Sequence, residues 1–314
     1  MNIIITGSIS YDRIMDFPGR FREHILPDKI HILNVSFTLN RFEEQFGGTA
    51  GNIAYNLKLL GLEPIIVAAA GGDFGCYAER LEKIGIKTKH VAIFENDQTA
   101  TAQMITDLDD NQISAFYPGA LAFGSQVGIP EEFKNKENLL IIAPSTKQEI
   151  AKRCQEAKAS QLPYIFDPGQ QIIALSPEEA VFGAANSKVS IFNDYEWQVF
   201  SDKSKLSLTD LTGKGIVVIV TRGQEGSIIY TLEREYKISA ANPEQVEDPT
   251  GAGDAYRAGI IAGIVNNWDW QIAGQLASTI ASFAVEHYGT QRHEPTLEQI
   301  RERYQKSFQN NCPI

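Results

Sequence analysis

The chain has 314 residues, of which 43% are hydrophobic and 21% are charged, so it can form a full core and is too apolar to be disordered. The 28 Lys and Arg against 39 Asp and Glu give a net charge of −11, which argues against nucleic acid and membrane surfaces as partners, because both attract basic patches. Three scattered cysteines exclude a disulfide framework or a cysteine-rich zinc site, and no signal peptide or membrane span is visible, so we expect a cytoplasmic protein.

Apolar patterning predicts a buried strand at residues 3–5, a half-exposed strand at 30–39, and a helix after the glycine-rich stretch 47–52. A second half-exposed region, 99–117, has a predicted hairpin turn at 107–111. Short apolar strands and helices then alternate, which is typical of a mostly parallel sheet with helices on both faces. The other expected strands are 65–67, 139–143, 164–167, 189–192, 216–221 and 227–230, and the other expected helices are 77–84, 149–159 and those after residues 253, 271 and 296. We therefore expect one α/β domain over residues 1–314, with a small β-sheet lid formed by about 12–46 and 97–120.

The run from Gly251 to Asp254 is the most informative motif. Pro249 keeps the entering chain extended, and Gly251 and Gly253, on either side of Ala252, allow a tight turn and a close approach to a ligand. Backbone N–H groups at the start of the following helix form an anion site. A carboxylate beside bound phosphate indicates a base that takes a proton from an attacking alcohol, so Asp254 is the candidate. The structural alternative is a glycine turn in front of a buried helix.

Four motifs occur in a fixed order along the chain. They are Gly47-Gly48 with Asn52, Asn193-x-x-Glu196, Thr221-x-Gly223-x-x-Gly226, and Gly251-Ala252-Gly253-Asp254. Through them the chain resembles the PfkB/ribokinase family of carbohydrate and nucleoside kinases over essentially its whole length. The resemblance implies a ribokinase-like α/β fold, in which a central, mostly parallel sheet is flanked by helices and a few strands form a lid over the phosphate acceptor.

The same resemblance implies an ATP-dependent phosphoryl transfer. Asp254 would be the general base, and the amides of Gly251, Ala252 and Gly253 would form the anion hole around the transferring group. Asn193 and Glu196 would organise Mg²⁺, generally through water, as suits an ion that dehydrates reluctantly. Without the family context they would be a helix-start Asn and a solvated Glu.

The ATP site is expected to include the segment after a buried strand and parts of the helices after residues 253 and 271. Its predicted residues are Asn193, Thr221, Gly223, Gly226, Arg257 and Ser282. Arg257 shares a helix face with Asp254, so contact with phosphate and a salt bridge elsewhere both remain open. Residues 281–289 match the family's last nucleotide-site segment, which in many members also holds a monovalent cation such as K⁺.

The acceptor site is expected around Asp12 and Asn52, which resemble the family's groups for sugar hydroxyls. Gly47 and Gly48 would let the ligand lie against the backbone. Asp12 could instead be a turn residue, and Asn52 a helix cap. Asp167, followed by Gly169 and Gln170, lacks the arginine of many sugar-kinase relatives, which favours a neutral acceptor over a phosphorylated sugar.

The predicted lid supplies Gln112 and the neighbouring aromatic residues Phe116 and Tyr117, which can offer hydrogen bonds and a flat face to a base. This favours a nucleoside acceptor, as in the microbial adenosine-kinase-like branch, although the aromatic residues could simply pack the lid. Two alternatives stay open, a ribokinase- or fructokinase-like sugar kinase and a non-catalytic ligand-binding protein. Open lid strands would seek a partner, so we also expect a homodimer through the lid.

Overall fold

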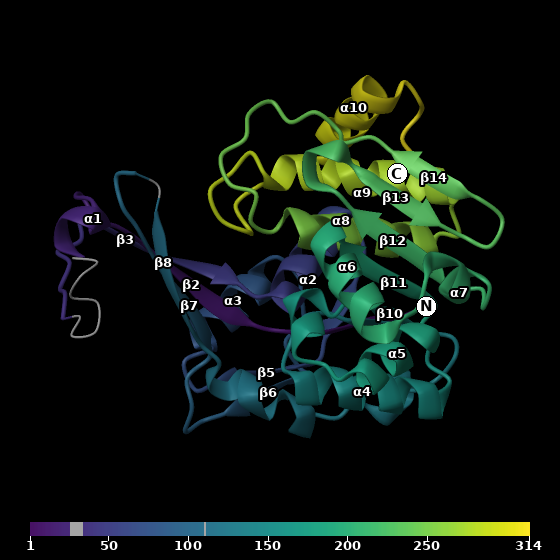
Figure 1. Ribbon diagram of the computed structural model, residues 1–314, viewed down its shortest axis with the longest axis horizontal. Coiled ribbons are helices and arrows are strands. Elements are labelled where there is room, and N and C mark those ends of the chain that lie inside the picture. The colour runs from purple at the N-terminus through teal and green to yellow at the C-terminus, as the bar shows by residue number, and fades with distance from the viewer. Residues whose placement is uncertain (26–33, 110) are drawn as a thin grey trace.

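The computed structural model describes residues 1–25, 34–109 and 111–314, and its centre is an eight-stranded sheet (Figure 1). The strand order is β14-β13-β12-β11-β10-β9-β1-β4. All neighbours from β12 to β4 pair in parallel, and β13 and β14 add an antiparallel edge. The strands are β1 (Ile3–Thr6), β4 (Pro64–Ile66), β9 (Leu139–Ile142), β10 (Tyr164–Phe166), β11 (Val189–Asn193), β12 (Val217–Thr221), β13 (Ser227–Tyr230) and β14 (Glu235–Ile238).

Helices cover both faces of this sheet, as its continuous apolar strands predict. One face carries α2 (Thr49–Leu59), α3 (Gly75–Lys83), α8 (Ala252–Val265), α9 (Trp270–Ala284) and α10 (Leu297–Phe308). The other carries α4 (Lys147–Ser160), α5 (Pro177–Ala185), α6 (Asp194–Ser204) and α7 (Leu208–Thr212). Short 3-10 helices lie at η2 (Gly119–Gln126), η3 (Glu131–Phe133), η4 (Gly169–Ile173) and η5 (Gly223–Glu225).

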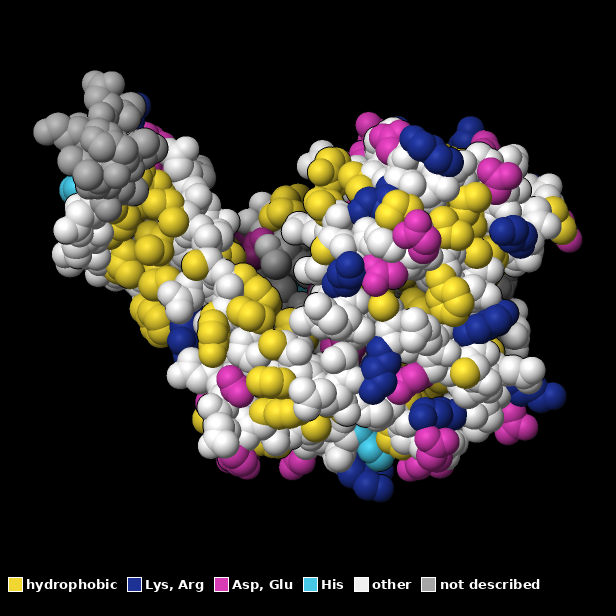
Figure 2. Space-filling model, turned by 60° about the horizontal axis from the view of Figure 1, so that its bottom comes forward, with side chains coloured by type: hydrophobic (Ala, Val, Ile, Leu, Met, Phe, Trp, Pro, Cys, Tyr) yellow, Lys and Arg dark blue, Asp and Glu magenta, His cyan; other side chains and the backbone are white. Residues whose placement is uncertain are grey.

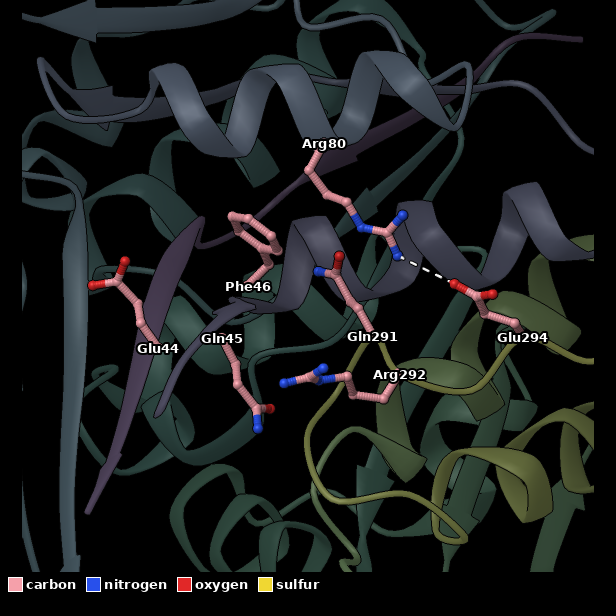
Figure 3. Close-up of a pocket in the computed structure, with 7 residues that line it drawn as sticks. All are labelled: Glu44, Gln45, Phe46, Arg80, Gln291, Arg292 and Glu294. Carbon is pink, nitrogen blue, oxygen red and sulfur yellow. Dashed lines mark ion pairs between the residues drawn. The ribbon is translucent and has the colours of Figure 1, made fainter. Parts of the chain in front are cut away.

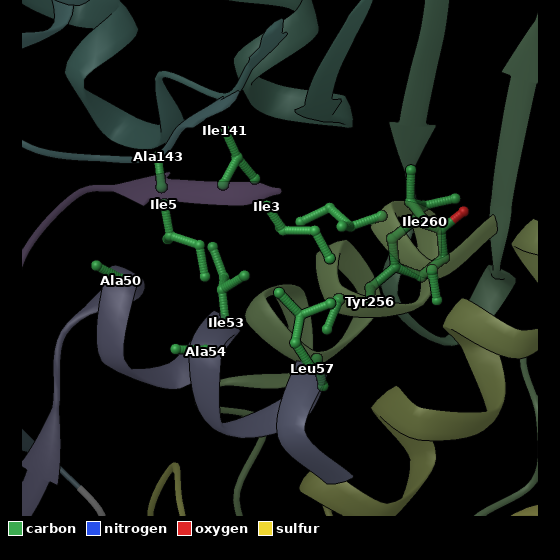
Figure 4. Close-up of a cluster of buried hydrophobic side chains, with 14 of the residues drawn as sticks. Ile3, Ile5, Ala50, Ile53, Ala54, Leu57, Ile141, Ala143, Tyr256 and Ile260 are labelled. Carbon is green, nitrogen blue, oxygen red and sulfur yellow. The ribbon is translucent and has the colours of Figure 1, made fainter. Parts of the chain in front are cut away.

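Strand β1 illustrates how the sequence divides the core. Ile3 and Ile5 pack with α2 and α8, as Figure 4 shows, whereas Ile4 belongs to the cluster under α4 to α7. Successive side chains of a strand point to opposite faces, so a continuous Ile run buries both sides of a sheet. The strand is therefore buried on both faces of the sheet, and its carboxyl end, Thr6, leads toward Ser8 in the loop that follows.

A separate four-stranded sheet projects from the core (Figure 1). Its order is β3-β2-β7-β8, with β2 parallel to β7 and the other pairs antiparallel. Its strands are β2 (Ser10–Asp16), β3 (Arg41–Gly47), β7 (Ala100–Thr106) and β8 (Gln112–Tyr117), and the short helix α1 (Phe21–His24) lies at its far end. Strands β5 (Ala68–Gly71) and β6 (Val91–Phe94) form a small parallel sheet. We call the four-stranded unit the projecting sheet.

The structure corrects the predicted strand at 30–39. Residues 30–33 lie outside the described part of the chain, and residues 34–39 form no strand. Phe37 packs instead against Phe17 and Phe21, with ring centroids 4.7 and 5.1 Å away. The strand begins at Arg41, where antiparallel pairing with Asp16 of β2 starts. The alternating apolar residues before Arg41 therefore predict a strand wrongly, because apolar side chains with the same spacing pack in a local aromatic cluster.

Helices α8 and α9 pack at close range through small residues. A Cβ placed on Gly259 would lie 2.3 Å from Cα of Ala277, and one on Gly263 would lie 2.3 Å from Cβ of Ala273. The missing side chains let the two helices approach closely, which fixes the position of α8. Among the described helices, none is long and apolar enough to cross a membrane.

Candidate active site

Parallel strands β1, β9, β10, β11 and β12 all end at one edge of the central sheet, where ligands of open α/β sheets bind. A cavity of about 320 Å³ opens there, beside the hollow between the core and the projecting sheet that Figure 2 shows. It is lined by Ser8, Thr49, Phe116, Leu121, Pro144, Ser145, Gly169, Gln170, Gln171, Glu196, Asp254 and Arg257. The cavity thus brings together four predicted site residues from distant parts of the chain: Phe116, Glu196, Asp254 and Arg257.

Asp254 lies in the first turn of α8. Gly251 caps this helix with φ +80°, the left-handed region that glycine adopts without strain, and no described side chain caps the helix. The Ala252 N–H donates to the Pro249 carbonyl at 3.3 Å, so an anion at this helix start would compete with that backbone hydrogen bond. Cβ on Gly253 would lie 2.7 Å from Nη1 of Arg257, so a larger residue there would disturb the guanidinium.

The Asp254 carboxylate is held by Asn52 of α2, whose Nδ2 donates to Oδ2 at 2.8 Å. Burial raises the pKa of Asp254 to about 6, while the Arg257 guanidinium and the Asn52 donor lower it. The nearby carboxylates of Asp167 and Asp12 raise it further. A carboxyl group with a pKa near neutrality is a suitable proton acceptor, since it is ionised at pH 7 and still basic.

Arg257 and Asp167 form a buried ion pair. Nη2 of Arg257 donates to Oδ1 of Asp167 at 2.6 Å, and Nε donates to Oδ2. Burial lowers the pKa of Arg257, but the carboxylates of Asp167, Asp254 and Glu196 together raise it by more, so the guanidinium stays charged. Of the two alternatives for Arg257, the salt bridge is present. Both oxygens of Asp167, predicted to bind substrate, are bonded to Arg257, so Asp167 shapes the cavity wall through this pair.

Asn193 and Glu196 form a reciprocal cap at the start of α6. Oδ1 of Asn193 accepts from the Glu196 amide at 2.7 Å, and Oε2 of Glu196 accepts from the Asn193 amide at 2.9 Å. Glu196 is nevertheless buried rather than solvated, and it lines the cavity. Burial raises its pKa. The pair therefore stabilises a helix and also places a carboxylate beside Asp254 and Arg257.

Three predicted residues share one face of the projecting sheet. Asp12 pairs with Ala102, and Ala102 pairs with Phe116. Gln112 lies four residues before Phe116 in β8 and pairs with Thr106, so its side chain is on the same face. Phe116 lines the cavity, so this face looks toward Asp254. Burial raises the pKa of Asp12 to about 6, the Ser10 hydroxyl lowers it, and Asp248 raises it.

Tyr117 points away from that face, because successive strand residues alternate. The structure thus corrects the expectation that Phe116 and Tyr117 offer one aromatic surface. Gln112 lies at the far end of β8 and is exposed, and it is not among the residues that line the cavity.

Gly47 and Gly48 join β3 to α2 beside the predicted acceptor site. Cβ on Gly47 would lie 2.2 Å from Oδ2 of Asp12. Gly48 has φ +87°, and Cβ there would lie 2.5 Å from the Ser8 carbonyl oxygen. Both positions therefore require glycine for reasons internal to the protein. The Asp12 carboxylate therefore lies directly against the buried Gly47.

The predicted ATP residues lie on the β12 side of the same sheet edge. Thr221 pairs directly with Asn193, and Gly223 and Gly226 form the turn that follows β12. None of these lines the cavity around Asp254. Ser282 is buried in α9, where its hydroxyl donates to the Thr279 carbonyl at 2.7 Å and accepts from Arg303. Its ATP-binding role therefore has no support from geometry and stays a prediction.

Sequence reasoning missed the polar side chains behind Asn52. Nε2 of Gln291 donates to Oδ1 of Asn52 at 3.0 Å and to the Tyr77 hydroxyl at 2.7 Å. A lone Gln in a loop carries no recognisable pattern, so only the fold could reveal it. In the described residues no cluster of three or more His, Cys, Asp or Glu could hold a metal. Mg²⁺ in phosphoryl-transfer sites needs only one or two protein carboxylates, so Glu196 suits it.

Comparison with known proteins agrees with this geometry. A nucleoside kinase of Methanothermobacter thermautotrophicus is 34% identical over 90% of this chain and 91% of its own length. A Burkholderia thailandensis nucleoside kinase in complex with inosine superposes with a TM-score of 0.86 at 35% identity, covering 98% of this chain and 99% of that one. Its complex described as ADP-inosine gives 0.84 at 36% identity, covering 99% and 97%. The family model for pfkB family carbohydrate kinases matches residues 9–297 of this chain. The chain therefore belongs to the pfkB family of carbohydrate kinases.

Proposed function

We propose that this protein is an ATP-dependent nucleoside kinase that transfers the γ-phosphoryl group of ATP to the 5′-hydroxyl of a nucleoside. The observation that carries the proposal is the Asp254 carboxylate, with its pKa near 6, at the uncapped start of α8 and in one cavity with Phe116. The relatives named nucleoside kinase, one of them solved in two complexes that contain inosine, support this acceptor.

In the proposed reaction Asp254 accepts the proton of the 5′-hydroxyl while that oxygen forms a bond to the γ-phosphorus. The bond from the γ-phosphorus to the bridging oxygen breaks, and ADP leaves with the electron pair. The N–H groups of Gly251, Ala252 and Gly253 stabilise charge on the phosphoryl oxygens. General-base catalysis contributes about 10²–10⁴-fold, so this is the loss expected on removing Asp254.

Asp12 and Asn52 would hold the ribose, beside Gly47 and Gly48. Phe116 would stack on the base, an interaction worth about 1–3 kcal/mol per base in nucleic-acid binders. Gln112 would reach the base only if the projecting sheet closes as a lid over residues of the core. We propose this closure because it would exclude water from the transfer step and so protect ATP from hydrolysis.

ATP would lie along the carboxyl ends of β11 and β12, against Thr221, Gly223 and Gly226. Glu196, positioned by Asn193, would hold Mg²⁺ through water. When bound, this ion neutralises charge on the phosphate oxygens. A K⁺ site in the 281–289 segment is a further proposal that rests on family resemblance alone.

The test is ATP turnover with Mg²⁺ against a panel of nucleosides and free sugars, run beside Asp254→Asn. Nucleoside-dependent ADP release that the variant loses supports the proposal, and turnover only with ribose or fructose would replace it with a sugar kinase. Phe116→Ala should raise KM for nucleosides, whereas Tyr117→Ala, on the opposite face, is its matched control. Ligand binding without turnover would indicate a non-catalytic binding protein.

We also propose a homodimer through the projecting sheet. Phe42, Met15, Ile105 and Ile113 occupy one register row across all its strands, on the face opposite to Asp12. Phe42 is 60% and Ile113 is 41% exposed, and β8 is exposed along its whole length. Sedimentation velocity should give a dimer that Ile113→Asp dissociates, and a monomeric wild type would refute it. A cytoplasmic location is proposed on the three free cysteines alone.

A further inference from the structure

A line of buried polar side chains runs from the projecting sheet to the catalytic carboxylate. The Tyr77 hydroxyl donates to the Gly47 carbonyl at 2.8 Å, and Nε2 of Gln291 donates to the Tyr77 oxygen at 2.7 Å. The same Nε2 donates to Oδ1 of Asn52 at 3.0 Å, and Nδ2 of Asn52 donates to Asp254 at 2.8 Å. We call Tyr77, Gln291 and Asn52 the amide relay. All three are buried, at 0, 5 and 3% exposure.

The direction of every hydrogen bond in the relay is determined by its ends. An ionised Asp254 can only accept, so Asn52 must turn its NH₂ group toward it and its Oδ1 toward Gln291. Gln291 must then present its own NH₂ group. The reverse orientation would place Oε1 of Gln291 against Oδ1 of Asn52, and two acceptors would face each other.

This orientation leaves a buried acceptor without a partner. In the part of the chain that the structure describes, Oε1 of Gln291 has no hydrogen-bond partner. Such atoms are rare in proteins and destabilise the fold, so each calls for an explanation. Here the explanation is that both hydrogens of the Gln291 amide are required on the side of Asn52 and Tyr77.

The loop that carries Gln291 is anchored to the same helix at a second point. Nδ2 of Asn56 donates to the Asn52 carbonyl at 2.8 Å, so Oδ1 of Asn56 accepts from Nε2 of His293 at 2.7 Å. The Tyr55 hydroxyl donates to the His293 carbonyl at 2.6 Å. Burial, together with the charge of His287, lowers the pKa of His293 to about 4, so the ring is neutral and Nδ1 is the atom left without a partner. These hydrogen bonds therefore fix the position of the loop relative to Asn52.

We propose that Gln291 is a positioning residue for catalysis, which keeps the Asn52 N–H turned toward Asp254 and so keeps the carboxylate oriented and ionised. This rests on the proposed role of Asp254 as the base. Without Gln291 the Asn52 amide can rotate and turn its oxygen toward Asp254. The carboxyl group then loses a donor and gains a repelling acceptor, and both effects raise its pKa.

The surroundings of Gln291 allow it to be replaced by a side chain of similar size. Its side chain lines a second cavity of about 520 Å³ between β3, α3 and the 291–294 loop, where Figure 3 shows it between Phe46 and Arg80. Because one side of the buried Gln291 borders this cavity, a side chain of similar size can take its place. Gln291→Leu removes the donor without adding charge, and Gln291→Glu keeps the shape but removes the donor when ionised.

The test is the pH dependence of kcat/KM for the best nucleoside, with folding checked by thermal melting. Both variants should move the acid limb about one pH unit higher, since one unit is the scale of one hydrogen bond to a charged group. For Gln291→Leu this gives a roughly tenfold loss of kcat/KM below the limb and a smaller one above pH 8. A ¹³C NMR titration of the Asp254 carboxyl should show the same rise without turnover. If Gln291→Leu does not fold, Gln291→Glu carries the test.

The matched control is Gln275, another buried amide, whose Oε1 accepts from the Tyr304 hydroxyl at 2.8 Å away from the site. Gln275→Leu should lower stability and leave the acid limb in place. An unchanged acid limb and an unchanged Asp254 titration in folded Gln291 variants would overturn the relay. Activity that survives in Asp254→Asn would instead overturn the base assignment, so the two failures are distinguishable.

Discussion

Replacing Arg257 by Met should destabilise the protein strongly, because it leaves the Asp167 carboxylate buried without its partner. Asp167 is 0% and Arg257 8% exposed, and the two are joined by two hydrogen bonds. Removing one member of such a pair costs about 3–5 kcal/mol. The guanidinium also lowers the pKa of Asp254 and Glu196, so three carboxyl groups lose a common counter-charge.

The cost should depend on pH with a defined sign. In Arg257→Met the folded-state pKa values of Asp254 and Glu196, already raised by burial, rise further because the guanidinium that lowers them is gone, so the folded state binds more protons than the unfolded chain. The loss should therefore be largest at pH 8 and smaller at pH 5.5. Urea unfolding followed by tryptophan fluorescence at both values measures it. Removing the other charge too, in Arg257→Met with Asp167→Leu, should recover most of the loss.

The exposed pair Arg222–Glu225 provides the control. Its side chains are 43 and 66% exposed, so Arg222→Met should cost no more than about 1 kcal/mol. The reasoning fails if Arg257→Met loses no more than this control, or if its loss is the same at both pH values.

Three further predictions follow from burial and backbone geometry. The kcat/KM of the wild type should fall about tenfold per pH unit below pH 6 as Asp254 is protonated, and a pH–rate profile flat to pH 5 would contradict this. Gly289→Ala should destabilise by more than about 1 kcal/mol in urea melts, because φ is +95° and the new Cβ would lie 1.5 Å from Oε1 of Gln45. Gly61→Ala, with φ +77° and open space, isolates the backbone part of that loss. His293, whose pKa is lowered to about 4, should make unfolding easier as pH drops below 6.5, since the unfolded chain binds the proton first. His293→Gln should remove about 3 kcal/mol of this pH dependence, and equal slopes in both proteins would exclude the assignment.

Local patterns predicted the start of α8 correctly, since a glycine pair before an apolar run is compatible with few other local structures. Gly251 does cap the helix in the left-handed region, and Asp254 does lie in its first turn. The alternation of apolar strands and helices likewise predicted the parallel sheet. Such features depend on residues within one turn or one strand, so residues adjacent in the sequence are enough to predict them.

Contacts between distant segments could not be predicted in this way. Arg257 forms its ion pair with Asp167, ninety positions earlier in the chain. Gln291, in a loop near the C-terminal end, donates a hydrogen bond to Asn52 near the N-terminal end. The Asn193–Glu196 motif shows a different limit. The same spacing is typical of a helix cap and of a ligand-binding pair. The cap is present in the structure, whereas the ligand-binding role stays a proposal that rests on the burial of Glu196, a tertiary property.

The contrast between the close α8–α9 packing and the exposed strand β8 has an evolutionary consequence. Helix α8 carries Asp254, the proposed base, and tolerates almost no added atom at Gly259 or Gly263, whereas every side chain of β8 is exposed. Substitutions should therefore accumulate on the projecting sheet long before they reach α8. A scaffold divided in this way can change the acceptor it recognises while the phosphoryl-transfer chemistry is inherited unaltered.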